Sequence, residues 1–493
     1  MSHTAFDQLC DTVREVALLR STESTLSWDQ ETYMPEKALA YRAKQMAWLS
    51  GKAHALASGR MMQKLLVQAQ NTRLRDPKAA ANMKVMLYDY ERAVKIPNKL
   101  VMEESSATSM AKHAWMEARK KSDFNIFAPH LEKLLSYARR RTELWGYADE
   151  PYDALLENYE RGTRTREVAA LFAKLKPDLV KTARIAVERG KSVKPNLLRG
   201  HYPIAKQQQL NAEIAASIGF DFGAGRIDTT AHPFCTTLGP RDVRLTTRYD
   251  EKDFTSSLFG VLHETGHGLY ELGLPEADFG LPSATACSLG IHESQSRLWE
   301  NHVGRSRSFW EKWLPRATEL FPHLKKISLE DFLAVITRSE YSFIRVESDE
   351  ATYDLHILLR FSLERRMVSG DLPTKDVPEA WNAEFKDLFG ISPPDDAHGC
   401  LQDIHWSMGG LGYFATYTLG NLNAAQLYQT ACKQTNIRKA VDQADYAPLL
   451  SWLREKVHVH GSVMLPGELI AQATGKPTDA RHYLKHLKDR FVK

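Results

Sequence analysis

Two histidines and a glutamate stand close together in the stretch HETGHGLYELG, residues 263–273. Positions four apart lie on one face of an α-helix, so His263 and His267 can direct their imidazoles at a single metal ion. Glu264 lies beside them as a candidate general base. This pattern is typical of zinc hydrolases. The alternative is a buried helix that carries two histidines and no ligand.

The flanking residues predict that this stretch is helical. Asp253 can cap the first turn, apolar residues recur with helical spacing, and Gly273 followed by Pro275 is a common stop. Gly266 and Gly268 each cost roughly 1 kcal/mol relative to alanine inside a helix. They indicate the close packing of another helix, open space for substrate above a metal ion, or both.

A catalytic zinc ion takes three protein ligands and leaves a fourth position for water, so the histidine pair needs one more donor. The best candidate is Glu293 in the downstream helical stretch IHESQSRLWEN. Glu300, His292 and Glu271 are the alternatives. We expect His292 to point elsewhere, about 100° around the helix from Glu293. Without a metal, Glu293 would instead form an ion pair with Arg297 at i+4.

Long amphipathic helices dominate the rest of the sequence and must position these residues. Ser328 with Asp331 is a capping-box-like start for one of them. We find no internal repeat and no flexible linker, so we expect one large helical unit over residues 1–493. Apolar residues recur at three- and four-residue spacing in residues 5–25, 37–58, 77–121, 128–145, 165–190 and 328–369.

One segment has the period of a β-strand instead. In DVRLTTRYD, residues 242–250, Val243, Leu245 and Thr247 alternate with more polar residues. The segment directly precedes the histidine stretch. It is therefore either an edge to which an extended peptide substrate pairs or an ordinary hairpin strand.

The composition favours a cytoplasmic protein. The formal charge is +4 with basic and acidic residues well mixed, so we expect neither nucleic acid nor an anionic membrane surface as a partner. No stretch approaches the roughly 18 consecutive apolar residues of a membrane span, and the N-terminus lacks the apolar core of a signal peptide. The five cysteines are scattered and odd in number, which indicates reduced thiols. We assign no chemistry to Cys235, Cys287 and Cys400.

Several motifs occur together in a familiar order. They are HPF (His232–Phe234), DVRLT (Asp242–Thr246), HETGH (His263–His267), HESQ (His292–Gln295), IRVESD (Ile344–Asp349) and GCLQDIHW (Gly399–Trp406). With SWDQETYMP and YDALLENYERG nearer the N-terminus, they resemble the carboxypeptidase Taq family of metallocarboxypeptidases over nearly the whole chain.

The resemblance implies a mainly α-helical fold with a deep groove and a small β-sheet, similar to neurolysin and angiotensin-converting enzyme. It implies a homodimer that removes single residues from the free C-termini of peptide substrates. It also implies one Zn²⁺ ion per subunit, or Co²⁺ in its place, and makes Glu293 the third ligand.

Roles for further residues follow from the charges of such a reaction. Glu264 can accept a proton from the attacking water and pass it to the leaving amine. Donors must meet the developing oxyanion, and His405 in QDIHW and Tyr413 in GGLGYF are our candidates. Similar donors serve this role in related helical metallopeptidases. The alternative is a core histidine and a packed tyrosine.

An exopeptidase must also recognise a free α-carboxylate, which a guanidinium binds bidentately. Arg345 in IRVESD is the leading candidate, and its alternative is an ion pair with Asp349 at i+4. Arg244 and His232 are weaker candidates, either for the carboxylate or for bracing the strand.

Two other functions compete with a carboxypeptidase. The same catalytic atoms would serve an oligopeptidase that cuts internally. A non-enzymatic helical scaffold would use HETGH for structural metal or for none. Structural zinc sites take four protein ligands that usually include cysteine. Neither HETGH nor HESQ contains one, although Cys287 is near.

Overall fold

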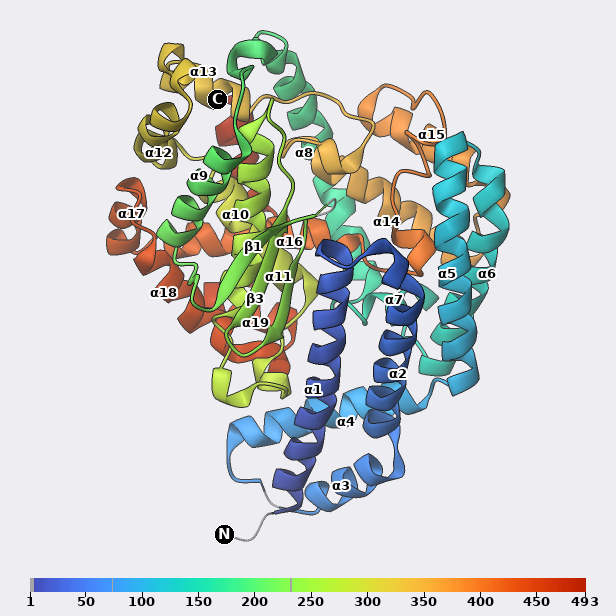
Figure 1. Cartoon of the computed structure of the whole chain (residues 1–493). Coiled ribbons are helices and arrows are strands. Elements are labelled where there is room, and N and C mark those ends of the chain that lie inside the picture. Colours follow the sequence, from blue (N-terminus) through green and yellow to red (C-terminus); the bar gives the residue numbers. More distant parts are fainter. Residues whose placement is uncertain (1–3, 73, 231–232) are drawn as a thin grey trace.

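The computed structural model describes residues 4–72, 74–230 and 233–493 and is mainly α-helical with one small β-sheet, as the sequence predicts (Figure 1). The first helices are α1 (Ala5–Thr32), α2 (Leu39–Ser58), α3 (Arg60–Gln70), α4 (Pro77–Val94), α5 (Asn98–Lys121), α6 (Phe124–Trp145), α7 (Pro151–Leu156), α8 (Thr165–Gly190) and α9 (Ile204–Ser217). After the sheet come α10 (Phe254–Glu271), α11 (Leu289–Arg297), α12 (Arg307–Leu320), α13 (Leu329–Ile336), α14 (Tyr353–Ser369), α15 (Val377–Phe389), α16 (Ala415–Ala431), α17 (Thr435–Asp442), α18 (Ala447–Lys456), α19 (Pro466–Thr474) and α20 (Arg481–Leu487).

The predicted helix over residues 77–121 is wrong as one element, because it is broken between α4 and α5. Pro97 lies at the break with an extended backbone, φ −62° and ψ 137°, and is the residue that directly precedes α5. Proline lacks the N–H that a continuous helix needs and clashes with the preceding turn. The chain therefore starts a new helix after it.

The predicted helix over residues 328–369 is also interrupted. Its start is confirmed, since the Ser328 side chain accepts a hydrogen bond from the Asp331 backbone N–H. However, α13 ends at Ile336, and α14 begins only at Tyr353. Between them the Asp349 carboxylate accepts hydrogen bonds from backbone N–H groups nearby, which is how such side chains compete with a helix.

Two large hydrophobic cores flank α16. One lies among α5, α6, α8, α14 and α15, and the other among the sheet, α9, α10, α12 and α18. Leu422 of α16 belongs to the first core and Leu427 to the second. α16 therefore joins the two halves of the packing. The prediction of one domain over residues 1–493 stays a prediction.

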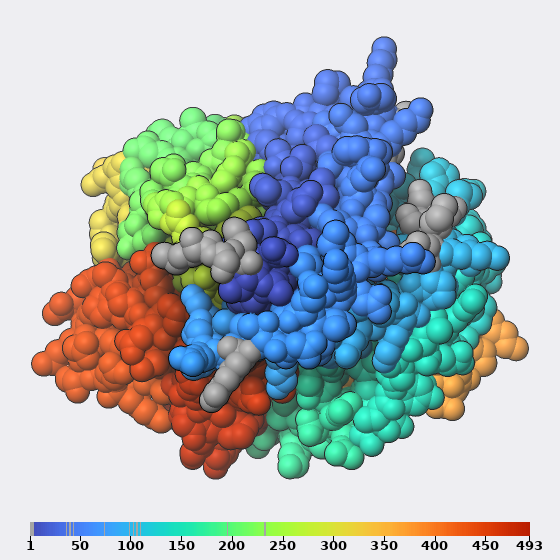
Figure 2. All heavy atoms as spheres, turned by 90° about the horizontal axis from the view of Figure 1, so that it is seen from below, coloured from blue at the N-terminus to red at the C-terminus, as the bar shows by residue number. Residues whose placement is uncertain are grey.

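The N-terminal helices form a separate layer. α1 packs against α2 and α3, with a small core of its own around Leu9, Met62 and Leu65. Seen from below, their blue atoms spread across the middle of the face, between the red C-terminal part and the cyan α5 and α6 (Figure 2). Within the described ranges we find no helix that is both long and apolar enough for a membrane span.

The β-sheet corrects one prediction. Its strands β1 (Gly225–Thr229), β2 (Cys235–Gly239) and β3 (Asp242–Thr247) lie in the order β1-β3-β2. β3 pairs with β1 in parallel and with β2 antiparallel, so it is the central strand and cannot be a peptide-binding edge. The hairpin alternative is right. β3 is held in the centre because its buried Val243 and Leu245 pack toward α10.

Candidate active site

The helix that carries the histidines forms as the sequence predicts. The Asp253 side chain accepts a hydrogen bond from the Thr255 backbone N–H, which caps the start of α10. The face opposite the histidines is buried, with Leu258 and Leu262 fully enclosed. α10 is thereby held between the sheet and α11.

The two glycines of α10 that flank His267 are explained by close packing. A Cβ atom added at Gly266 would lie 2.6 Å from both the Gln295 carbonyl oxygen and Ser296 Cα on α11. A Cβ at Gly268 would lie 3.0 Å from the ring of Phe220. Close packing, against α11 at Gly266 and against Phe220 and strand β3 at Gly268, is therefore what these glycines permit, rather than open space for substrate. The absent side chain at Gly266 lets α11 approach α10.

This approach brings the three predicted ligands together. One ligand atom each of His263, His267 and Glu293 lies within 4.8 Å of the others. Nε2 of His263 and Nε2 of His267 lie 3.6 and 3.5 Å from Oε2 of Glu293. Two ligands of one tetrahedral zinc ion at about 2.1 Å lie about 3.4 Å apart. The donor set and its spacing therefore fit Zn²⁺ or Co²⁺.

α16 covers the third member of this set. A Cβ atom at Gly420 would lie 2.6 Å from Cγ of Glu293, so only glycine allows this approach. Arg297 donates to Oε1 of Glu293 at 2.7 Å. The ion pair at i+4 thus exists, but it occupies one oxygen and leaves Oε2 facing the histidines. The two interpretations of Glu293 are compatible.

The three alternative ligands lie one contact further out. Oε2 of Glu300 is 3.0 Å from Nδ1 of His263. Nδ1 of His292 contacts Nδ1 of His267, and its Nε2 lies 2.8 Å from Oε1 of Glu271. His292 thus stays outside the ligand group, as expected, but it contacts one of the ligands. Because α11 crosses so close to α10, the side chain of His292 reaches Nδ1 of His267, the ring nitrogen that does not face Glu293.

Glu264 lies beside this cluster and not within it. It is buried on α10. The pKa of its carboxyl is raised to about 7, chiefly by burial; His263 opposes the shift and the charge of Glu293 adds to it. A carboxyl in such surroundings binds a proton more readily than an exposed one.

The structure brings His405 and Tyr413 together, and Tyr413 lies close enough to Glu293 to be affected by its charge. Their ring centroids lie 5.2 Å apart. Burial lowers the pKa of His405 to about 4, so its imidazole is neutral. Burial, and then the charge of Glu293, raise the pKa of Tyr413, so its phenol stays protonated. Both are therefore neutral hydrogen-bond donors.

Tyr417 joins this pair, although nothing in the motifs singles it out. Its hydroxyl lies 3.3 Å from Nε2 of His405, and its ring centroid lies 5.4 Å from that of Tyr413. The one available sign is its spacing, four residues after Tyr413 where α16 begins. Such a spacing is common enough in core helices to carry no prediction.

Arg345 adjoins the same group. Its Nε and Nη2 donate to Oδ1 of Asp403 at 3.0 and 2.9 Å, and Nη1 donates to the Tyr353 hydroxyl at 2.9 Å. The alternative pairing with Asp349 is wrong, since that carboxylate binds backbone N–H groups. The guanidinium is buried and lies 5.0 Å from the ring of Tyr417.

Asp403 forms ion pairs with two arginines at once. Arg360 donates to its Oδ2 at 2.6 Å while Arg345 occupies Oδ1. Although burial raises the pKa of Asp403, these two cations hold it well below its usual range. One carboxylate facing two guanidinium groups leaves a surplus of positive charge in the interior. An anionic group of a ligand would be attracted to it.

Arg244, one of the two weaker candidates, contacts a neighbouring strand residue and α1. Arg244 on β3 donates from Nη2 to Oδ2 of Asp242 at 3.0 Å and lies 4.7 Å from the ring of Trp28 on α1. These contacts brace the strand against α1, which is the second of its two predicted roles. His232 lies outside the described residues.

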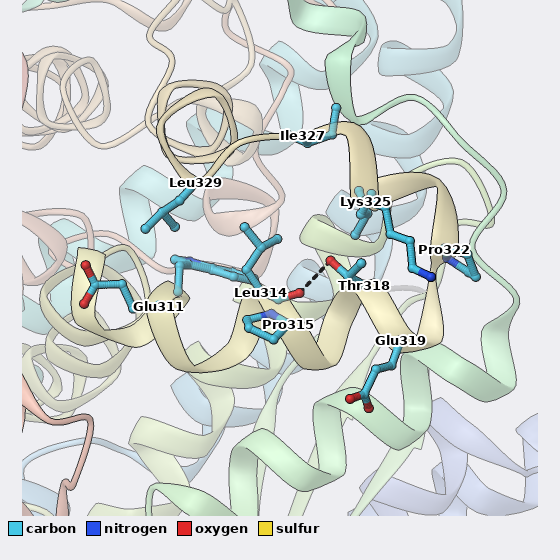
Figure 3. Close-up of a pocket in the computed structure, with 11 residues that line it drawn as sticks. Glu311, Leu314, Pro315, Thr318, Glu319, Pro322, Lys325, Ile327 and Leu329 are labelled. Carbon is cyan, nitrogen blue, oxygen red and sulfur yellow. Dashed lines mark hydrogen bonds between the residues drawn. The ribbon is translucent and has the colours of Figure 1, made fainter.

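A separate hollow of about 620 Å³ lies between α12 and the segment that leads to α13 (Figure 3). Leu314, Ile327 and Leu329 line it, and none of its lining residues belongs to the ligand cluster. It carries no part of the site.

The five cysteines are unpaired, and Cys287 and Cys400 are buried.

The chain matches known metallopeptidases over nearly its whole length. Residues 8–491 match the family model for carboxypeptidase Taq (M32) metallopeptidases. The chain is 41% identical to thermostable carboxypeptidase 1 of Thermus thermophilus, over 99% of this chain and 98% of that protein. It is 36% identical to carboxypeptidase 1 of Bacillus subtilis, again over 99% and 98%.

Solved structures give the same result. The M32 carboxypeptidase from Deinococcus radiodurans R1 superposes with a TM-score of 0.96 at 37% identity, covering 99% of this chain and 98% of that one. The carboxypeptidase of Pyrococcus furiosus gives a TM-score of 0.95 at 38% identity, covering 100% and 99%. The chain therefore belongs to the carboxypeptidase Taq (M32) family of metallopeptidases.

Proposed function

We propose that the protein is a metallocarboxypeptidase that hydrolyses the C-terminal peptide bond of peptides and releases single amino acids with broad specificity. The observation that carries this proposal is the spacing of His263, His267 and Glu293, with Glu264 beside them. We assign one Zn²⁺ ion per subunit to these three residues, with Co²⁺ as a possible substitute. A homodimer in the cytoplasm, as the resemblance and the unpaired cysteines favour, is part of the same proposal.

The ion, when bound, supplies a Lewis acid that polarises the scissile carbonyl and lowers the pKa of the attacking water. Glu264 accepts the proton of that water and delivers it to the leaving amine. Because Glu264 is buried, bulk water does not compete for the proton. His405 and Tyr413, two neighbouring neutral donors, stabilise the oxyanion that develops on the carbonyl.

Arg345 binds the terminal carboxylate of the peptide in this proposal. A guanidinium has five N–H donors, and three of those on Arg345 have partners among the described residues. The remaining N–H groups can donate hydrogen bonds to a substrate carboxylate. The surplus positive charge shared with Arg360 and Asp403 favours an anion at this position.

For Arg345→Ala we expect kcat/KM on free-acid peptides to fall by an amount on the order of 2 to 4 kcal/mol in transition-state stabilisation, the scale of unpairing a desolvated charge. On C-terminally amidated peptides, which are already poor substrates, the change should be small. Metal content should stay the same. Steady-state kinetics on matched acid and amide peptides measures the difference.

Two further variants test whether such a loss comes from binding of the substrate carboxylate. Arg345→Lys should restore only part of the loss, because an ammonium group cannot reproduce a bidentate fork. Arg244→Ala should show no preference for acid over amide peptides. Equal losses on both substrates in Arg345→Ala would mean that this residue only supports the fold through Asp403, and an acid-selective loss in Arg244→Ala would transfer the role there.

The second candidate function is an oligopeptidase that cuts internally, since the same ligands and base would serve it. One long peptide incubated with the protein, followed by mass spectrometry with and without a chelator, separates the two. We expect a ladder of products shortened one residue at a time from the C-terminus, abolished by the chelator. Internal fragments, or equal cleavage of an amidated peptide, would reject the carboxypeptidase.

A further inference from the structure

A chain of contacts extends from one histidine of the cluster to the edge strand of the sheet. Nδ1 of His267 contacts Nδ1 of His292, and Nε2 of His292 lies 2.8 Å from Oε1 of Glu271. The Thr237 hydroxyl on β2 then donates to Oε2 of Glu271 at 2.9 Å. The side chains of His292 and Glu271 are 18% and 17% exposed, so water has little access to these contacts.

The two histidines of the cluster are thus supported differently. Nδ1 of His263 faces a carboxylate directly, that of Glu300 at 3.0 Å. His267 reaches its carboxylate, Glu271, only through the imidazole of His292. A residue that merely filled space at position 292 would not continue the chain of polar contacts.

The direction of the hydrogen bonds follows from the donors available. His267 presents Nε2 to Glu293, so its N–H lies on Nδ1 when Nε2 is a ligand. It therefore donates to Nδ1 of His292, which places the proton of that ring on Nε2. Nε2 then donates to Glu271. Each polar atom of the chain has a partner of the right kind in this one arrangement.

We propose that His292 is a positioning residue, which holds the Nδ1–H tautomer and the ring orientation of His267 and is itself held by Glu271 and Thr237. The proposal rests on the assignment of His263, His267 and Glu293 as the ligands. It gives His292 a role in metal affinity without any contact with the ion. It also ties the edge strand β2 to the ligand cluster.

Metal affinity tests this role directly. Zn²⁺ and Co²⁺ dissociation constants would be measured by chelator competition, together with thermal unfolding of the metal-free proteins. We expect His292→Ala to weaken binding about 10- to 100-fold, the usual effect of losing the partner of a ligand. His292→Asn should recover part of the loss, because its amide oxygen can take the place of Nδ1. The Co²⁺ absorption spectrum should shift in His292→Ala.

A double variant tests whether Glu271 acts on His267 through His292. Glu271→Ala alone should weaken binding, but added to His292→Ala it should cause no further loss. Thr237→Val should have a smaller effect, and its neighbour Thr236→Val, which does not contact Glu271 among the described bonds, should have none.

Unchanged affinity in folded His292→Ala would overturn the proposal, and so would additive losses in the double variant. Either result would leave the ligand assignment intact provided that Glu293→Ala loses the ion. If Glu293→Ala instead keeps full affinity, the ligand assignment itself fails. The two failures are therefore distinguishable.

Discussion

In Glu264→Gln we expect turnover to fall by about 100- to 10,000-fold or more, the range for removing a general base. The amide keeps the shape of the carboxylate but cannot accept the proton of the attacking water. Glu264 is buried on α10 and lies outside the ligand cluster, so the ion should remain. Single-turnover kinetics and metal analysis on the same preparation measure both effects.

The control is a glutamate of the same chain that lies away from the cluster. Glu276 is largely exposed and its nearest cationic partner, Arg241, is 3.9 Å away. Glu276→Gln should keep wild-type turnover. About one equivalent of metal should be present in both variants. Turnover near wild type in Glu264→Gln would remove Glu264 from its role as the base.

In Glu293→Ala we expect the metal to be lost or bound far more weakly, and activity to be lost with it. Two imidazoles alone bind a divalent metal ion weakly, so the loss of the third ligand directly lowers the metal affinity. The effect should exceed the roughly 10- to 100-fold that a supporting partner contributes. Metal analysis after dialysis, with chelator competition, measures it.

Glu300→Gln is the matched comparison for this variant. Glu300 is the next glutamate along the helical segment and contacts Nδ1 of His263, the ring nitrogen that is not assigned as a ligand atom. Its amide oxygen can still accept a hydrogen bond from that imidazole, so its affinity loss should be smaller. Full metal content in Glu293→Ala, or a larger loss in Glu300→Gln, would show that the third ligand is misassigned.

The helices could be predicted from the sequence wherever periodicity and a cap agree. α8 occupies the predicted residues 165–190, and α10 begins after Asp253 as its cap requires. Periodicity failed where a local feature overrides it. Pro97 breaks one apolar pattern, and the Asp349 carboxylate draws backbone N–H groups away from another.

The ligand cluster could be anticipated because i, i+4 geometry is local. The contacts around the cluster could not be predicted from the sequence. The side chain of His292 reaches His267 only because Gly266 lets α11 approach so closely, and that crossing depends on the packing of two helices. Arg345 finds its partner in Asp403, 58 residues further along the chain, and no spacing rule links them.

The close fit of α16 over Glu293 bears on when, during folding, the protein can acquire its ion. α10 and α11 are neighbours in the sequence, so the histidines and Glu293 can approach through local contacts. α16 begins only at Ala415, and a long loop must close before Gly420 reaches Glu293. Until that happens, water competes for the carboxylate. We therefore expect full affinity only after this long-range docking step, so that metal uptake during refolding reports completion of the fold.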